Sequence, residues 1–120
     1  MATPNPHSLL PLQPSSFHIL VSLADADRHG YAIIQDISER TAGTVRLGAG
    51  TLYRTIQRLL EDGLILEVGD RERPDPDDDD ERRRYYRLTA FGRAVARAEA
   101  ERLAGLVKLA RASGLAPKRT

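Results

Sequence analysis

One stretch of the chain, GAGTLYRTIQRLLEDGLI at residues 48–65, carries side chains of the types that contact nucleic acid bases. Four of them recur at i, i+3, i+4 and i+7, the spacing that places residues on one face of a helix: Thr51, Arg54, Thr55 and Arg58. Arginine reads guanine with two hydrogen bonds, and threonine contacts a base edge or the thymine methyl. This pattern favours a helix that reads the DNA major groove. The polar face of an ordinary surface helix remains the alternative.

Two further residues flank this face. Tyr53 and Gln57 lie at i, i+4 on its border, and we assign both to the DNA backbone. A different role is open for Tyr53, whose ring would then pack between helices with only the hydroxyl exposed. No acid precedes Glu61 in the stretch, so the start of the helix favours phosphate.

Enzyme chemistry is not expected. The chain has no cysteine, and its three histidines, His7, His18 and His29, show no metal-ligand spacing on one helix. The serines lie in no nucleophile elbow. The four consecutive aspartates lack the glycine and the terminal glutamate of a calcium loop. We predict no catalytic residue, no metal and no cofactor.

Composition and charge favour an intracellular partner of polyanions. The chain has 120 residues, which suggests one domain with at most one additional element, and its net charge is +1. Residues 70–81 carry a net charge of −6, so the remainder carries +7. Neither a signal peptide nor a run of about 18 apolar residues is visible, so we expect a cytoplasmic protein that does not cross a membrane.

The spacing of apolar residues, together with the residues that typically begin and end helices and strands, predicts the elements that position these residues. Helices are predicted at 14–27, 30–42 and 50–62, strands at 64–69 and 83–88, and a long helix at 90–112 after the N-cap Thr89. The predicted fold is mainly α with a small β-hairpin, a winged helix-turn-helix. The domains expected are a flexible arm at 1–13, the DNA-binding domain at 14–88, a dimerisation helix at 89–112 and a flexible tail at 113–120.

Three motifs together resemble the PadR family of bacterial transcriptional regulators. They are HGYAI at 29–33, the stretch at 48–65 and RRRYYRLTAFGR at 82–93, and the likeness covers about residues 10–93. The resemblance implies a homodimer that binds a pseudo-palindromic operator. It also implies repression, which in many members is relieved by a small, often aromatic or planar compound.

The resemblance also suggests roles for single residues. The matching positions are Tyr31 in the preceding helix, Gly50, Thr51, Leu52 and Tyr53 at the start of the recognition helix, Arg58 and Leu59 further along it, Arg84, Tyr85 and Tyr86 in the wing, and Thr89 and Gly92 after it. We assign Tyr31 to the DNA backbone. Many members have proline where Arg54 stands, and family wings are commonly basic, whereas residues 70–81 are acidic. The backbone contacts of the wing are therefore expected from Arg82, Arg83, Arg84 and Arg87.

The last helix is longer than a domain of this size can cover, at ~35 Å for about 23 residues. A two-fold dimer would cover its apolar positions: Phe91, Val95, Leu103, Leu106, Val107 and Ala110. Two recognition helices would then meet half-sites ~34 Å apart. The alternative is that its first half packs on its own domain and the rest frays. Any effector pocket is expected near Phe17, Tyr31 or Phe91.

A function of another class remains open. Winged-helix domains also bind proteins, and the acidic loop would then dock a basic partner. The uniformly positive or neutral groups at positions 51–58 favour DNA over that alternative.

Overall fold

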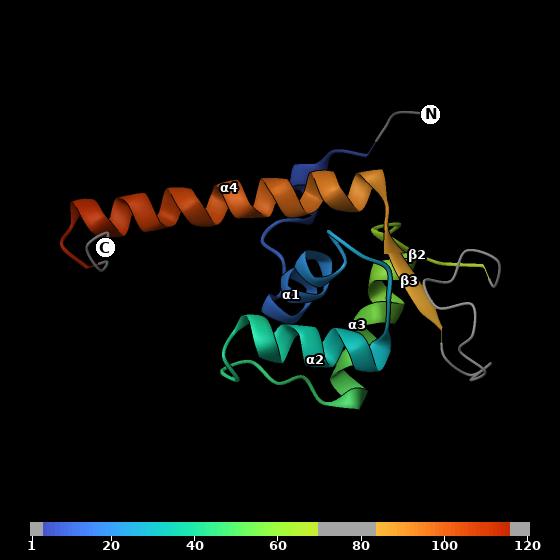
Figure 1. Cartoon of the computed structure of the whole chain (residues 1–120). Coiled ribbons are helices and arrows are strands. Elements are labelled where there is room, and N and C mark those ends of the chain that lie inside the picture. The colour runs from blue at the N-terminus through green and yellow to red at the C-terminus, as the bar shows by residue number, and fades with distance from the viewer. Residues whose placement is uncertain (1–3, 70–83, 116–120) are drawn as a thin grey trace.

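The computed structural model describes residues 4–69 and 84–115. Within them the chain forms, in order, η1 (Pro6–Leu9), α1 (Pro14–Ser22), β1 (Arg28–His29), α2 (Gly30–Arg40), α3 (Ala49–Glu61), β2 (Ile65–Glu67), β3 (Tyr85–Leu88) and α4 (Ala90–Ala112). Figure 1 shows α4 lying across one side of the molecule, with α1, α2 and α3 beneath it and the strands at its N-terminal end. The predicted winged helix-turn-helix with a long final helix is confirmed.

The three-helix core is built from aliphatic side chains at helical spacing. The residues that are at most 2% exposed include Ile19 and Leu20 of α1, Ile33 and Ile37 of α2, and Leu52, Ile56 and Leu59 of α3. Because each helix buries one stripe of this kind, its opposite face is left to solvent. For α3, that opposite face carries the candidate base-reading residues.

The first helix ends five residues earlier than the predicted Asp27. Arg28 donates from Nε to the carbonyl of Ser22 at 2.9 Å, which satisfies an acceptor at the end of α1. The same arginine begins β1, which pairs with β3 through Arg28 opposite Tyr86 and His29 opposite Tyr85. Helix α1 therefore ends at Ser22, and the chain continues into a short strand that pairs with the edge of β3.

The wing is a three-stranded antiparallel sheet in the order β1-β3-β2, not the two-stranded hairpin that we predicted. Strand β2 pairs with β3 from Ile65 opposite Leu88 to Glu67 opposite Tyr86. Both strands are shorter than their predicted ranges in the described part. The acidic loop predicted between them lies outside the described residues, as do Arg82 and Arg83.

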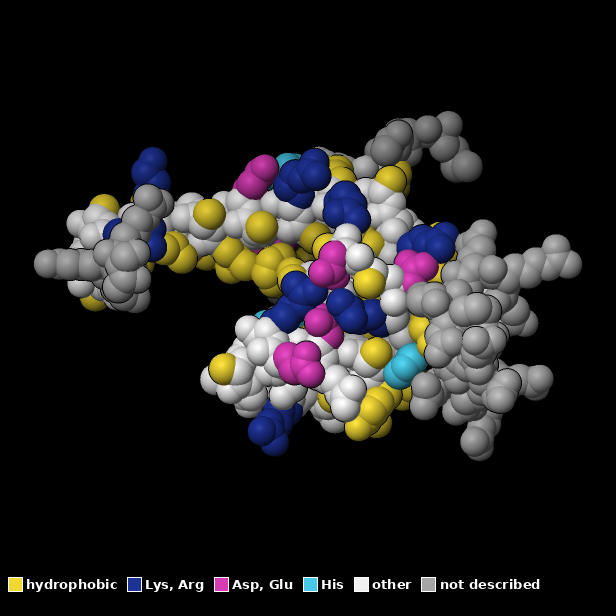
Figure 2. Space-filling view, viewed as in Figure 1, with side chains coloured by type: hydrophobic (Ala, Val, Ile, Leu, Met, Phe, Trp, Pro, Cys, Tyr) yellow, Lys and Arg dark blue, Asp and Glu magenta, His cyan; other side chains and the backbone are white. Residues whose placement is uncertain are grey.

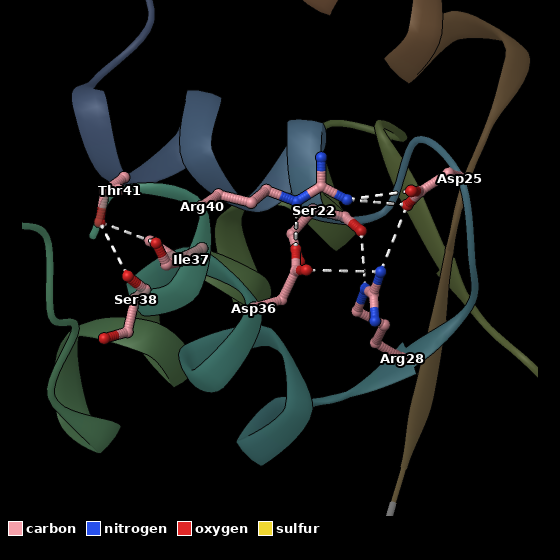
Figure 3. A network of polar contacts seen from close by, with 8 residues as sticks. All are labelled: Ser22, Asp25, Arg28, Asp36, Ile37, Ser38, Arg40 and Thr41. Atoms are coloured by element: carbon pink, nitrogen blue, oxygen red, sulfur yellow. Dashed lines mark hydrogen bonds and ion pairs between the residues drawn. The ribbon is translucent and has the colours of Figure 1, made fainter. Parts of the chain in front are cut away.

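A charged network fixes α2 against the turn after α1 (Figure 3). The Asp36 carboxylate accepts from Arg40 Nε at 2.8 Å and lies 3.5 Å from a guanidinium nitrogen of Arg28. Arg40 also contacts Asp25 at 3.0 Å, and its hydrogen bond is the main cause that lowers the pKa of the Asp25 carboxyl. The two arginines thus hold the N-terminal half of the helix-turn-helix in place.

Helix α4 begins as predicted, at the cap Thr89. The Thr89 hydroxyl accepts from the Gly92 amide at 2.9 Å, and it lies 2.7 Å from the carbonyl of Gly63, to which it donates. A Cβ on Gly92 would lie 1.9 Å from the Leu64 carbonyl oxygen, so only glycine allows this close approach. The start of α4 is therefore tied directly to the beginning of β2.

Part of the segment predicted to be a flexible arm packs against the last helix. Among residues 4–13, Pro6–Leu9 form a 3₁₀ turn that packs against α4. The Leu12 amide donates to the Glu99 carboxylate at 2.7 Å, and Glu99 is 1% exposed and paired with Arg102. The Arg102 guanidinium, helped by the Leu12 amide, holds the pKa of Glu99 below its ordinary value against the opposing effect of burial.

Candidate nucleic-acid interface

The outer face of α3 presents the predicted base-reading residues. Thr51, Arg54 and Arg58 are exposed and Thr55 is partly buried, on the side opposite the buried Leu52. We call these four residues the recognition face. Among the residues that the structure describes, neither Arg54 nor Arg58 forms an ion pair with an acid, so both guanidiniums are free to meet an external anion.

One flank of the recognition face meets the start of α1. A cavity of about 310 Å³ lies there, lined by Gln13, Ser15, Ser16, Thr51, Arg54, Thr55 and Arg58. The hydroxyls of Ser15 and Thr55 lie 3.5 Å apart across it. Sequence reasoning missed Gln13 and Ser15, because neither belongs to α3 and only the folded chain brings them beside it.

The other flank meets the wing. Tyr53, Gln57 and Arg84 line a second cavity of about 310 Å³, with Tyr86 at its base. The Tyr53 side chain is 53% exposed, and its hydroxyl reaches α2, where a Cβ on Gly30 would lie 2.6 Å from it. Burial, followed by the nearby Glu67 and Tyr53, raises the pKa of Tyr86.

Two further residues assigned to the DNA backbone, Tyr31 and Arg84, are exposed. Tyr31, on α2, is 61% exposed, and its hydroxyl accepts from the Gln35 amide at 3.1 Å. Arg84 is exposed just before β3 and lies 3.9 Å from Glu67, a long and weak ion pair. Both side chains remain accessible to a ligand.

Arg87 is placed differently from the prediction. Its guanidinium binds the Asp27 carboxylate, with the shortest contact at 2.8 Å, so it joins β3 to the turn before β1. The prediction placed Asp27 inside the first helix, and this pairing could not be anticipated while that boundary was wrong. Arg82 and Arg83 stay predictions, since they lie outside the described residues.

The predicted dimer positions fall into two groups along α4. Val95 is fully buried within the subunit, and Phe91 is partly buried against the same core. Beyond Arg102 the apolar side chains turn outward, with Leu106 50% and Val107 42% exposed. Figure 2 shows hydrophobic side chains along the lower edge of α4 in that view.

The described ranges contain neither a metal-binding cluster nor a membrane-spanning helix. No group of three or more histidine, aspartate or glutamate side chains that could hold a metal ion occurs among residues 4–69 and 84–115. In that same part of the chain, each helix is too short or too polar to cross a membrane.

Known proteins share this sequence pattern. Residues 19–98, two thirds of the chain, match the model of the transcriptional regulator PadR-like family. Transcriptional regulator Rv3488 of Mycobacterium tuberculosis is 39% identical over 77 residues, 64% of each chain. An uncharacterised protein of Lysinibacillus sphaericus is 38% identical over 76 residues, 63% of this chain and 65% of that protein. The chain thus spans just under two thirds of the length of these curated relatives.

Solved structures share the fold. A transcriptional regulator from Clostridium thermocellum aligns with a TM-score of 0.67 and 27% identity, covering 80% of this chain and 88% of that one. A PadR family transcription regulator from Clostridium difficile aligns with a TM-score of 0.67 and 22% identity, covering 82% of this chain and 96% of that one. Bacillus subtilis PadR in complex with operator DNA aligns with a TM-score of 0.58 and 19% identity, covering 78% of this chain and 48% of that one. With the family match over two thirds of its length, the chain belongs to the PadR-like family of transcriptional regulators.

Proposed function

We propose that the protein is a sequence-specific DNA-binding repressor that acts as a homodimer on a pseudo-palindromic operator. The observation that carries this proposal is the recognition face, where two guanidiniums point to solvent without an acidic partner in the described part of the chain. In contrast, Arg28, Arg40 and Arg87 are bound by carboxylates of the same subunit. Arginines left unpaired on one exposed helix are suited to DNA.

The base-reading role falls to the N-terminal half of α3. Thr51, Arg54 and Thr55 lie within its first two turns, and residues near the start of a recognition helix reach the base edges. Arg54 is central to the exposed face and has the donors to read guanine. Tyr53, Gln57 and Arg84, which line the cavity beside the wing, and the exposed Tyr31 are assigned to the DNA backbone.

A homodimer is supported by the second half of α4. Leu103, Leu106, Val107 and Ala110 follow the i, i+3, i+4, i+7 spacing of one helical stripe, and the subunit itself leaves this stripe largely uncovered. Covering it with the same helix of a second subunit removes apolar surface from water. Two recognition faces would then be related by a two-fold axis, as a pseudo-palindromic operator requires.

Relief by a small molecule is supported by one apolar cleft. It has a volume of about 260 Å³ and lies between α1 and α4, lined in part by Phe17, Val21 and Ala96. This volume lies just below the ~300 Å³ at which typical ligand pockets begin, so only a small compound would fit. Of the three residues expected near an effector, only Phe17 lines the cleft, and Tyr31 lies on the side assigned to DNA.

Selection of bound sequences from a random duplex pool tests the proposal. We expect enrichment of a site with two-fold symmetry and half-sites about one helical turn apart. An unenriched pool would refute sequence-specific binding. Capture of a basic protein through residues 70–81, with no affinity for duplex DNA, would favour the interaction module instead.

A further inference from the structure

We propose that Gln13, Ser15 and Arg58 form a seat for a phosphate of the DNA backbone, on the flank of the recognition face opposite the wing. This inference rests on the proposed DNA-binding function and extends it to residues of the arm and α1. It also moves Arg58 from the base-reading group to the backbone group.

The geometry of the major groove requires contacts on two flanks. The groove is about 12 Å wide, so a helix inserted into it lies between the phosphates of both strands. Tyr53 and Arg84 serve only the flank beside the wing. On the other flank, the cavity of about 310 Å³ is lined by Gln13 and Ser15 together with residues of α3. A backbone phosphate on the flank away from the wing would therefore contact these side chains.

The chemistry of this cavity suits an anion. Glutamine amides, serine hydroxyls and arginines are common donors to phosphate oxygens. Gln13 is exposed at the cavity rim, and the Ser15 hydroxyl lies 3.5 Å from that of Thr55. None of the residues that line this cavity is acidic. One carboxylate, that of Asp62, lines the adjoining cavity that Gln13 and Arg58 share.

The position of Arg58 separates it from Arg54. Arg58 lies nine residues after the start of α3, ~13 Å along the axis. It also lines the adjoining cavity of about 170 Å³ beneath the arm, with Pro11, Leu12 and Gln13, whereas Arg54 does not. Arg58 therefore lies beside the arm, away from the end of the helix that enters the groove.

The arm holds Gln13 in place from the other side. Leu12, its neighbour, is fixed to α4 by the hydrogen bond from its amide to Glu99. Gln13 is thus carried on a segment anchored to the helix proposed for dimerisation, and its distance to Arg58 is set by the fold. The backbone that carries Gln13 is therefore already fixed before binding, which lowers the entropic cost of the contact.

The test introduces charge at Gln13 and measures binding of the full chain to a random-sequence duplex by fluorescence anisotropy over a salt series. Gln13→Glu should weaken binding about five- to tenfold at low salt, and Gln13→Lys should strengthen it by a similar factor. The matched control is Asn5→Asp, which makes the same isosteric amide-to-acid change on the arm outside the cavity. It should leave affinity unchanged.

Arg58→Ala should lower affinity for all sequences alike and reduce the salt slope by about one. Wild-type protein that binds no duplex would refute the proposed function and the seat together. If the wild type binds duplex DNA but Gln13→Glu and Asn5→Asp change its affinity equally, the seat alone is refuted. The seat is also refuted if Gln13→Lys does not raise the affinity. A change of base preference in Arg58→Ala would return Arg58 to the base-reading group and also overturn the seat.

Discussion

The backbone amide of Leu12 donates a hydrogen bond of 2.7 Å to the carboxylate of Glu99, which lies 87 positions further along the chain. Glu99 is buried, and its second partner is the guanidinium of Arg102. One carboxylate therefore connects the arm, which borders the recognition face, with the helix that we propose for dimerisation.

Removing this carboxylate should loosen the arm. Glu99→Ala leaves the Leu12 amide without its acceptor and should lower the free energy of unfolding by about 1.5–3 kcal/mol. Hydrogen exchange at Leu12 should accelerate. Glu101→Ala, which removes an exposed acid two residues away, is the control and should change stability by less than about 0.5 kcal/mol. Equal effects of the two substitutions would contradict the anchoring role of Glu99.

The same carboxylate should make stability depend on acid. The pKa of Glu99 is lower in the folded protein than its ordinary value, so the folded state binds fewer protons. Its contribution is present above the ordinary glutamate pKa of about 4.3 and is lost as the pH falls through the lower folded value. Chemical unfolding of wild type and Glu99→Gln between neutral and acidic pH measures this. The stability difference should shrink in acid, and a constant difference would argue against it.

Two glycines of α4 should respond in opposite directions to alanine. Gly92→Ala places a methyl against the Leu64 carbonyl and should destabilise the fold or abolish it. Gly105→Ala meets nothing within 4 Å and should stabilise the helix by about 0.5–1 kcal/mol. Thermal unfolding by circular dichroism compares them. Equal tolerance of both changes would show that α4 does not pack on β2 as described.

The exposed stripe of α4 should control assembly. Leu106→Glu places a charge in the proposed interface and should convert a dimer into a folded monomer, as measured by sedimentation equilibrium. Lys108→Glu introduces an acid at an exposed position on the other side of α4, and it should leave the dimer intact. A wild-type monomer, or a dimer that persists with Leu106→Glu, would exclude this interface.

The elements with strong local signals could be predicted from the sequence. Helix α4 was predicted at its observed bounds, because Thr89 caps it and neither proline nor a charged break interrupts it. The end of α1 could not be predicted, since the carbonyl of Ser22 is satisfied by Arg28 only after β1 has paired with β3. A two-residue strand has no periodicity of its own.

The candidate site could be predicted only where it lies on a single helix. Thr51, Arg54 and Thr55 follow from spacing along α3. Gln13 and Ser15 join the surface through packing between α1 and α3, which no local pattern encodes. A buried glutamate such as Glu99 resembles any surface acid in sequence, because its two partners are supplied by the arm and by Arg102.

The most direct test of the central claim is the affinity of wild type and Arg54→Ala for a selected operator duplex and for the same duplex with one base pair changed at a time. We predict that wild type discriminates at a base pair in each half-site, and that Arg54→Ala loses about 1–3 kcal/mol of discrimination at that base pair alone. A base-reading role for the exposed face of α3 would be contradicted if Arg54→Ala discriminates between the duplexes as well as wild type does. It would also be contradicted if Arg54→Ala binds every duplex more weakly by the same factor.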